Sequence, residues 1–539
     1  MPRIDRRQFL ALAGTLAAAA PLPYGVPYAF GATPPAPRRG GVLTLLVDPE
    51  PPTLLSIANT AGSTVKTSAK TNEGLLKYGF DLQPQPQLAT AWQVSSDGLQ
   101  YRFTLRRGVK WHDGQPFTSA DVAFSIGLLK EVHPRGRGTF ANVTEVRTPD
   151  DATAIVILSK PSPYLLRAFD SAESPIVPKH LYRDTELQKI AAHPNNNAPI
   201  GTGPFRFKEW VRGSHVIYER NPDYWDAGKP YIDRLIVKFI PDPAARAAAF
   251  ESGTVDLGGE SPVPLSDLAR LRDNPTLTFD TRGYEYSITQ TRIEFNLDHP
   301  ILGKLPVRQA IAHALDRKVI RNTIWYGYAN DSPTPIAPGS PFHDPRPTPY
   351  PYDPKKAEAL LDAAGYPRRA DGKRFALVHD FLPYGDGFKR VADYLKTALA
   401  RVGIDVTIRA QDFPTYIRRV YTERDFEFTN NSMGNFFDPT AGVQRLYWSQ
   451  NFKRGVPFSN GSHYTNADVD RLLEAAAVES DTAKRRELFA RFQQIVEDEL
   501  PDINLVSLKQ VTIANSRVQD HTTTASGLNG TLADVWLRA

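Results

Sequence analysis

Residues 101–122 read YRFTLRRGVKWHDGQPFTSADV, and this stretch carries a strand, a turn and the start of a helix. Apolar and polar side chains alternate with period two in Tyr101–Leu105, which predicts a strand with one buried face. Thr118 and Asp121 stand at the spacing of a capping box, in which both side chains bind free backbone N–H groups where a helix begins. Asp113 lies in the tight turn between them, where its carboxylate is expected to bond its own backbone.

Strand and helix patterns alternate on both sides of this stretch. Runs typical of strands are Val42–Val47, Pro204–Trp210, His215–Glu219, Leu235–Ile240, Ile404–Ala410 and Val511–Ala514. Runs typical of helices are Pro243–Phe250, Pro354–Ala364, Tyr384–Val402 and Ala467–Leu500, the last broken into two helices near Ser480. This alternation predicts a mixed α/β protein of at least two lobes, with the last strand returning to the first lobe.

The composition narrows the possible functions. Of 539 residues, 41% are hydrophobic and 23% are charged, as in globular proteins. The chain has no Cys, which excludes disulfides, Cys-ligated zinc, iron–sulfur clusters and thiol nucleophiles. The formal charge of +5 is mild and the basic residues are scattered, so no nucleic-acid partner is expected.

The N-terminus has the layout of an export signal. Arg6 and Arg7 precede the apolar run Phe9–Ala20, which is shorter than the roughly 20 apolar residues of a membrane span. The arginine pair resembles the twin-arginine type of signal. Residues 1–31 are therefore expected to be removed just before Ala32. The alternative is an apolar tail on a cytoplasmic protein.

Signatures of catalysis and metal binding are missing from the sequence. It contains no H-E-x-x-H, no G-x-S-x-G and no G-x-x-x-x-G-K-[ST]. His112 and Asp113 are adjacent, but their place in a tight turn favours a structural role over a base or a metal ligand. The other histidines are dispersed without helical ligand spacing. Neither a metal nor a cofactor is expected.

Seven stretches follow one another in an order that carries a resemblance. They are Leu105–Val122, Gly201–Phe205, Asn221–Trp225, Phe250–Leu257, Phe295–Leu297, Val307–Arg317 and Tyr352–Tyr366. Together they resemble the family 5 extracellular solute-binding proteins, the group of periplasmic oligopeptide-, dipeptide- and nickel-binding proteins. The resemblance covers essentially the whole chain after the signal.

The resemblance implies an α/β fold of the periplasmic binding protein type II kind, with two α/β lobes around a hinged cleft and a smaller inserted domain. Domain I would comprise residues 36–73, 173–283 and 509–539. Domain II, the insertion, would comprise residues 74–172, and domain III residues 284–508.

The implied function is that of a periplasmic substrate-binding protein, not an enzyme. It would capture a peptide-sized polar solute and deliver it to the inner-membrane permease of an ABC importer. Because the chain has neither a Cys for lipid attachment nor a later apolar run of spanning length, we expect a soluble monomer without a membrane anchor in the periplasm.

The stretch Phe428–Pro439 is predicted to be a loop that meets the ligand, because it mixes Asn, Gly and aromatic residues between a strand and a helix. The resemblance adds a cleft-facing turn at residues 59–62. The predicted ligand-binding residues are Asn59, Thr60, Ala61, Gly62, Tyr286, Asn431, Met433, Gly434, Asn435, Phe436 and Phe437. An ordinary surface loop is the alternative interpretation of the stretch.

Asn435 matters most among these residues. It stands four places before Pro439, where family members that bind peptides have an acidic residue that receives the peptide ammonium. An amide carries no charge, so we expect a ligand that is neutral or anionic at that end, such as an opine-like compound, a sugar conjugate or a blocked peptide. The competing class of protein is a secreted hydrolase that uses the carboxylates of Glu294 and Asp438.

Replacing Arg6 and Arg7 with Lys is expected to block export, because the receptor of the twin-arginine route reads the arginine pair. Immunoblotting of periplasmic fractions measures it. Normal periplasmic accumulation of the double variant would contradict the twin-arginine assignment and favour the general secretion route.

Overall fold

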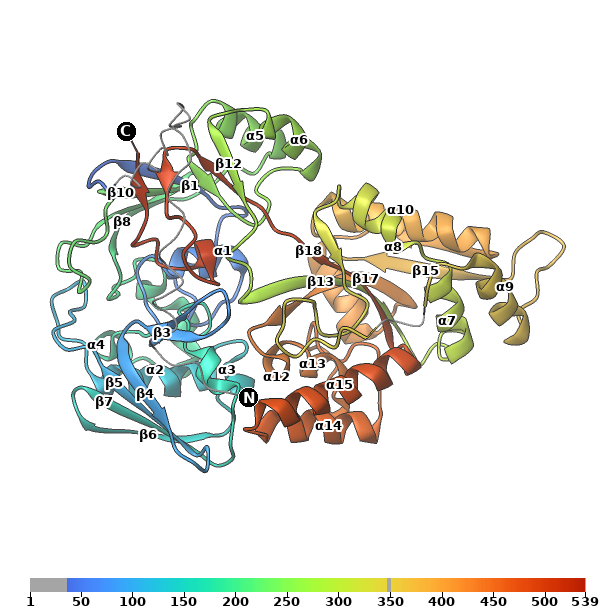
Figure 1. Cartoon of the computed structure of the whole chain (residues 1–539), viewed down its shortest axis with the longest axis horizontal. Helices are drawn as coiled ribbons and strands as arrows, with labels where there is room; N and C mark the ends of the chain where they lie inside the picture. Colours follow the sequence, from blue (N-terminus) through green and yellow to red (C-terminus); the bar gives the residue numbers. More distant parts are fainter. Residues whose placement is uncertain (1–35, 347–349, 539) are drawn as a thin grey trace, which may run out of the picture. The chain divides into compact units, whose positions relative to one another are not determined.

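The computed structural model describes residues 36–346 and 350–538, so the predicted export signal at residues 1–31 lies outside the described residues. The described residues form a seven-stranded, a six-stranded and a four-stranded sheet, together with two short two-stranded ribbons (Figure 1). Helices alternate with these strands along the chain, which confirms the predicted α/β class.

The seven-stranded sheet is assembled from stretches that are far apart in the sequence. Its strands in spatial order are β12 (Leu277–Asp280), β19 (Thr512–Asn515), β11 (Leu257–Gly258), β1 (Val42–Leu46), β10 (Arg234–Lys238), β9 (His215–Arg220) and β8 (Phe205–Val211). Strand β1 runs parallel to β10 and β11. Strand β19 pairs with β11 and β12, so the predicted return of the chain near its end is confirmed.

The four-stranded sheet contains the stretch from which the fold was predicted. Its strands are β4 (Ala89–Val94), β5 (Gln100–Leu105), β7 (Thr153–Leu158) and β6 (Val143–Asp150), all antiparallel. Exposed and buried residues alternate along β5. Helix α2 (Ser119–Val132) begins at the predicted capping box. The carboxylate of Asp121 accepts bonds from the backbone N–H groups of Thr118 and Lys179, both at 2.9 Å.

The six-stranded sheet forms the centre of the second half of the chain. Its strands are β14 (Ala329–Asp331), β18 (Asp502–Leu508), β13 (Ser287–Phe295), β17 (Phe428–Phe436), β15 (Phe375–Phe381) and β16 (Ile404–Arg409). Antiparallel pairing joins β13 to β17 over the full length of both strands. Apolar side chains of Ile293, Phe295, Phe428 and Ile503 lie in its core.

The longer predicted helices are present with their expected ends. They are α5 (Pro243–Glu251), α9 (Pro354–Ala363), α10 (Asp386–Arg401), α14 (Ala467–Val478) and α15 (Thr482–Glu499). Gly365 and Gly403, which follow α9 and α10, have φ angles of 88° and 86°, where a side chain with a Cβ would be strained.

The prediction of a loop at Phe428–Pro439 is wrong. Residues Phe428–Phe436 are strand β17, and only Phe437 and Asp438 separate it from helix α12 (Pro439–Gly442). The polar side chains that suggested a loop are buried and bonded within the protein. Asn435, for example, donates from Nδ2 to Oε1 of Gln290 on the neighbouring strand at 2.8 Å. Buried amides with partners are compatible with an internal strand.

Two connections join the seven-stranded and six-stranded sheets. Residues 281–286 lead from β12 to β13, and residues 509–511 lead from β18 back to β19. Short paired connections of this kind can act as a hinge between lobes. Among the described residues, no helix has both the length and the apolar character needed to cross a bilayer.

Replacing Asp121 with Ala is expected to lower the free energy of unfolding by about 2 kcal/mol, because it removes a helix cap and leaves the N–H of Lys179 without its acceptor. Chemical denaturation measures the loss. Asp481→Ala is the matched control, since Asp481 binds only the first N–H groups of its own helix. Equal losses in the two variants would contradict the second role of Asp121.

Candidate functional site

A cavity of about 230 Å³ lies where the two connections meet the lobes. Ligand cavities are typically roughly 300–1,000 Å³, so this one suits a small solute. Its lining comes from widely separated parts of the described chain and includes Thr60, Gly62, Arg135, Glu173, Glu260, Tyr284, Tyr286, Ser287, Phe436, Gln510 and Asn529. Because the lining comes from separate lobes and their connections, the shape of the cavity depends on the relative orientation of the lobes.

The first-lobe wall of the cavity is held in an unusual backbone conformation. Glu260 and Ser261 have φ angles of 59° and 55°, a region that is costly for residues other than glycine. The hydroxyl of Tyr284 accepts a bond from the N–H of Glu260 at 2.9 Å. The carboxylate of Glu260 lies 3.2 Å from the ammonium of the buried Lys66. This wall is therefore fixed by the first connection and by an ion pair.

A second ion pair of the lining joins Arg135 to Glu173. Arg135 donates from Nε to Oε2 of the buried Glu173 at 2.8 Å, and Thr139 donates to Oε1 at 2.8 Å. Burial opposes ionisation of Glu173, but the Arg135 guanidinium and the protein donors hold the pKa of its carboxyl below its ordinary value. Both carboxylates of the lining are thus engaged with cations of the protein.

The structure places four of the predicted ligand-binding residues in the cavity lining: Thr60, Gly62, Tyr286 and Phe436. Asn59 and Ala61 belong to the same turn, where Oδ1 of Asn59 accepts from the N–H of Ala61 at 2.9 Å. Ala61 is the N-cap of helix α1 (Gly62–Ser68). Of the predicted turn at residues 59–62, Thr60 and Gly62 therefore line the cavity, whereas Asn59 and Ala61 do not.

The other five predicted residues are not part of the cavity lining. Met433 and Phe437 are buried in hydrophobic cores, and Asn431 bonds to Glu294 and Arg292. Gly434 packs so closely that an added Cβ would lie 3.0 Å from the ring of Phe436. Asn435 is buried, and its Oδ1 accepts from the N–H of Ala337 at 2.9 Å. Both the oxygen and the nitrogen of its amide are thus bonded within the protein.

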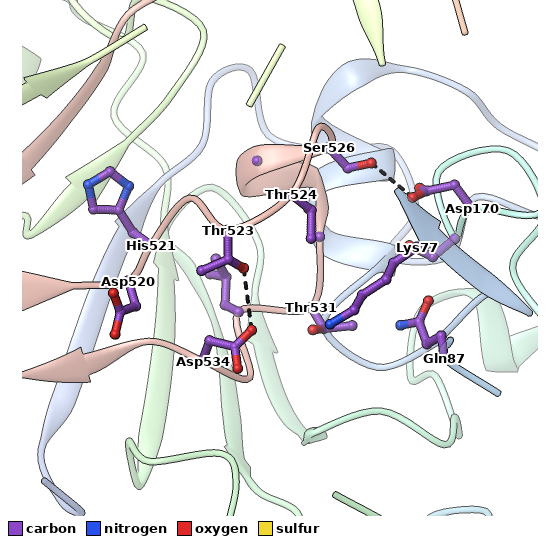
Figure 2. Close-up of a pocket in the computed structure, with 14 residues that line it drawn as sticks. Lys77, Gln87, Asp170, Asp520, His521, Thr523, Thr524, Ser526, Thr531 and Asp534 are labelled. Carbon is purple, nitrogen blue, oxygen red and sulfur yellow. Dashed lines mark hydrogen bonds between the residues drawn. The ribbon is translucent and has the colours of Figure 1, made fainter. Parts of the chain in front are cut away.

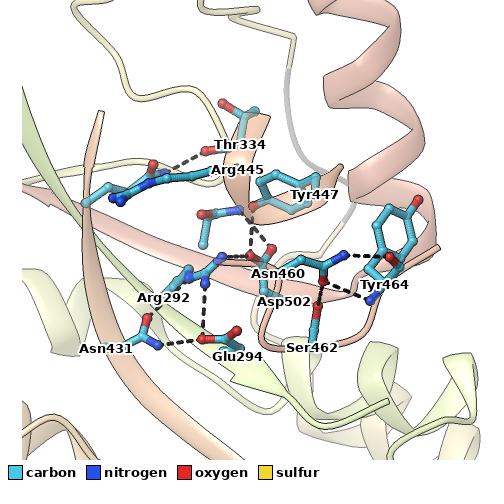
Figure 3. Close-up of polar contacts among 12 residues, drawn as sticks. Arg292, Glu294, Thr334, Asn431, Arg445, Tyr447, Asn460, Ser462, Tyr464 and Asp502 are labelled. Carbon is cyan, nitrogen blue, oxygen red and sulfur yellow. Dashed lines mark hydrogen bonds and ion pairs between the residues drawn. The ribbon is translucent and has the colours of Figure 1, made fainter. Parts of the chain in front are cut away.

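A buried ionic cluster links the neighbouring strands β18, β13 and β17 (Figure 3). Arg292 donates to Asp502 at 2.7 Å and lies 3.1 Å from Oε2 of Glu294. Tyr447 donates its hydroxyl to Asp502, and Asn431 donates to Glu294, both at 2.7 Å. These contacts pair the buried charge of Arg292 with the carboxylates of Glu294 and Asp502. Glu294 therefore serves the fold.

Asp438 joins the end of β17 to two other elements. Its carboxylate accepts two bonds from Arg485 of helix α15 at 2.8 and 2.9 Å, and Arg167 lies 3.6 Å away. It also caps α12 through the N–H of Thr440. Burial opposes ionisation, but Arg485 and Arg167 hold the pKa of the Asp438 carboxyl below its ordinary value.

Sequence reasoning missed most of the charged lining. Arg135 lies between α2 and α3 (Gly136–Thr139), Glu173 lies in a turn, and Glu260 follows β11. None of them belongs to a local motif that signals a ligand. The predicted structural role of His112 is supported, because its ring nitrogens bond to the backbone of Gly201 and Gly203.

A second cavity, shown in Figure 2, has a volume of about 40 Å³. It is lined by Lys77, Asp170 and residues of the C-terminal segment such as His521 and Asp534. This volume holds a few waters at most. Within residues 36–346 and 350–538, no three His, Cys, Asp or Glu side chains gather in a way that could hold a metal ion.

Comparison with known proteins gives consistent matches. The model of the family described as bacterial extracellular solute-binding proteins, family 5 Middle, matches residues 83–454. A Brucella ovis protein whose name describes an ABC transporter peptide-binding protein is 30% identical over 426 residues, which are 76% of this chain and 75% of that protein.

Two solved structures share the fold over nearly the whole chain. NikZ from Campylobacter jejuni, in complex with Ni(L-His), is 25% identical with a TM-score of 0.79, covering 92% of this chain and 96% of that one. AgaA from A. tumefaciens R10, in complex with agropinic acid, is 27% identical with a TM-score of 0.75, covering 93% and 99%.

Replacing Asp438 with Asn is expected to lower the free energy of unfolding by about 3–5 kcal/mol at neutral pH, because buried arginines lose their carboxylate while an amide still caps α12. Chemical denaturation of wild type and variant measures the difference. A carboxyl with a lowered pKa stabilises the fold above its unfolded pKa of about 3.9 and loses this effect as the pH falls. The difference between the two proteins should therefore begin to narrow below about pH 4.

Asp184→Asn is the control for this prediction, since the side chain of Asp184 is 88% exposed, and it should leave stability nearly unchanged. A constant difference between Asp438→Asn and wild type from pH 7 to pH 3 would contradict the role of the ionised carboxylate.

Proposed function

The chain belongs to the family 5 bacterial extracellular solute-binding proteins, and from this premise we propose that its cavity captures a small polar solute for delivery to an inner-membrane permease. Members of this family are substrate-binding proteins of ABC importers for peptides or related solutes, and they are not enzymes. The lining of the cavity by both lobes, the inserted domain and both connections supports this proposal.

We propose domain boundaries that follow from the same scheme. Residues 36–73, 173–283 and 509–539 form domain I, residues 74–172 domain II and residues 284–508 domain III. The four-stranded sheet lies within the second range and the six-stranded sheet within the third. Rotation about residues 281–286 and 509–511 would open and close the cavity, and a solute that contacts both lobes would favour the closed state.

The solute is proposed to lack a free ammonium group. A buried ammonium needs a carboxylate partner, because an unpaired buried charge is very costly. The lining offers only Glu173 and Glu260, and each of these is already paired with a cation. Asn435, which the resemblance placed at the ammonium position, carries no charge and does not line the cavity, and both ends of its amide are bonded to the protein.

The ligands named for similar proteins indicate which kinds of solute this cavity could bind. The names and titles of similar proteins mention a peptide, Ni(L-His) and agropinic acid. A blocked peptide, an opine-like compound or a sugar conjugate would each satisfy a cavity without a free carboxylate. Thr60, Gly62, Tyr286 and Phe436 would contact such a solute from the two lobes.

The alternative of a secreted hydrolase has no support from the geometry. Its two carboxylates would be Glu294 and Asp438, and each is held by buried arginines away from the cavity lining. The remaining parts of the proposal are export through the twin-arginine route, location in the periplasm and a monomeric state without a membrane anchor.

N-acetyl-dialanine is expected to bind at least about tenfold more tightly than dialanine, because the free dipeptide must bury an ammonium without a free carboxylate. Isothermal titration calorimetry on the mature protein measures both. Native mass spectrometry of the protein purified from a periplasm gives an independent readout, namely a bound small molecule of unaltered mass. Tighter binding of dialanine than of its acetylated form would contradict the proposal.

A further inference from the structure

Two guanidinium groups lie close to the Phe436 ring that lines the cavity. The Cζ atom of Arg135 is 4.7 Å from the ring centroid, and that of Arg445 is 5.5 Å from it. Both distances are within the range of a cation–π contact. Arg135 belongs to the inserted domain, whereas Arg445 lies on helix α13 (Gln444–Tyr447) that follows β17. Arg135 lines the cavity, whereas Arg445 is not among the lining residues and borders the cavity at the Phe436 ring.

The two arginines differ in how their charges are balanced. Arg135 is paired with Glu173 through two of its nitrogens. Arg445 takes part in none of the ion pairs found among the described residues. In the same part of the chain, the carbonyl of Gly442 is the one acceptor that its guanidinium reaches, through Nε at 3.3 Å.

The carboxylates around Arg445 already have partners. Glu173, whose charge acts on the Arg445 guanidinium, is paired with Arg135. Glu294 and Asp502 both bind Arg292 in the buried cluster, and Figure 3 shows Arg445 beside that cluster. Burial and the like charges of Arg135 and Arg292 lower the pKa of the Arg445 guanidinium to about 10, so it stays protonated at neutral pH. A partly buried cation without a partner is costly, and an anion beside it relieves that cost.

We propose that Arg445 binds an acidic group of the solute, a carboxylate or a phosphate, while Phe436 packs against the adjoining part of the solute. This assignment rests on the proposed function and narrows it to acids that lack a free ammonium group. A guanidinium suits this task because its planar fork donates two parallel bonds to either kind of oxyanion. The free nitrogens of Arg445 are available for such a pair.

Two pairs of probes that differ in their acidic group test the assignment by calorimetry. N-acetyl-dialanine is compared with its C-terminal amide, and N-acetylglucosamine 6-phosphate with N-acetylglucosamine. One acidic probe is expected to bind at least about tenfold more tightly than its neutral twin. The pair that shows this preference distinguishes a carboxylate from a phosphate.

Arg445→Gln is expected to abolish this preference, and Arg445→Lys to restore part of it, because the ammonium keeps the charge but not the fork. Arg471→Gln is the matched control, since Arg471 is exposed and on the outer face of α14, and it should keep the preference. Without probe, Arg445→Gln should melt at or above the temperature of the wild type, because it removes an unbalanced charge. If Arg445 were needed only for the fold, Arg445→Gln would instead lower the melting temperature.

Equal affinities for the acidic and neutral twins, or an acid preference that survives Arg445→Gln, would overturn the assignment while leaving solute binding intact. Failure of all four probes to bind would overturn it as well. Absence of any small molecule from the protein purified from a periplasm would instead overturn the proposed function itself.

Discussion

The ion pairs of Asp438 hold together the parts of the molecule on which the cavity depends. This carboxylate is fully buried where β17 ends, between Arg485 of α15 and Arg167 of the inserted domain. The two residues before it diverge. Phe437 packs against Tyr286 in a hydrophobic core, with ring centroids 5.0 Å apart, and Phe436 lines the cavity. One buried charge thus positions a strand end, a domain contact and a cavity wall.

The elements that the sequence predicts well are those determined by short-range chemistry. The alternation in residues 101–105, the capping box at Thr118 and the glycines that end α9 and α10 all act within a few residues of the chain. The family resemblance supplied the larger arrangement, and the matched family model supports it. Local signals of this kind need no knowledge of what packs against them.

The site could be predicted only in part, because its chemistry depends on residues far apart in the sequence. The mixture of Asn, Gly and aromatic residues in β17 predicts a loop when nothing is known of what packs against it. Gln290, Ala337 and Glu294 satisfy these amides from other segments. The role of Arg445 likewise depends on distant residues, because it takes part in none of the ion pairs of the described residues and the carboxylates around it are held by other arginines. Thr60, Gly62, Tyr286 and Phe436 could be predicted as lining residues because the resemblance indicates that their segments face the cleft.

The central claim is that this cavity selects a solute by its acidic group and offers no carboxylate to an ammonium. A crystal structure of the protein purified from a periplasm with its bound solute tests this claim most directly. The account predicts a carboxylate or phosphate of the solute within hydrogen-bonding distance of the Arg445 guanidinium, with Phe436 against the same molecule. A solute ammonium bound to Glu173 or Glu260, with Arg445 making no contact, would contradict it.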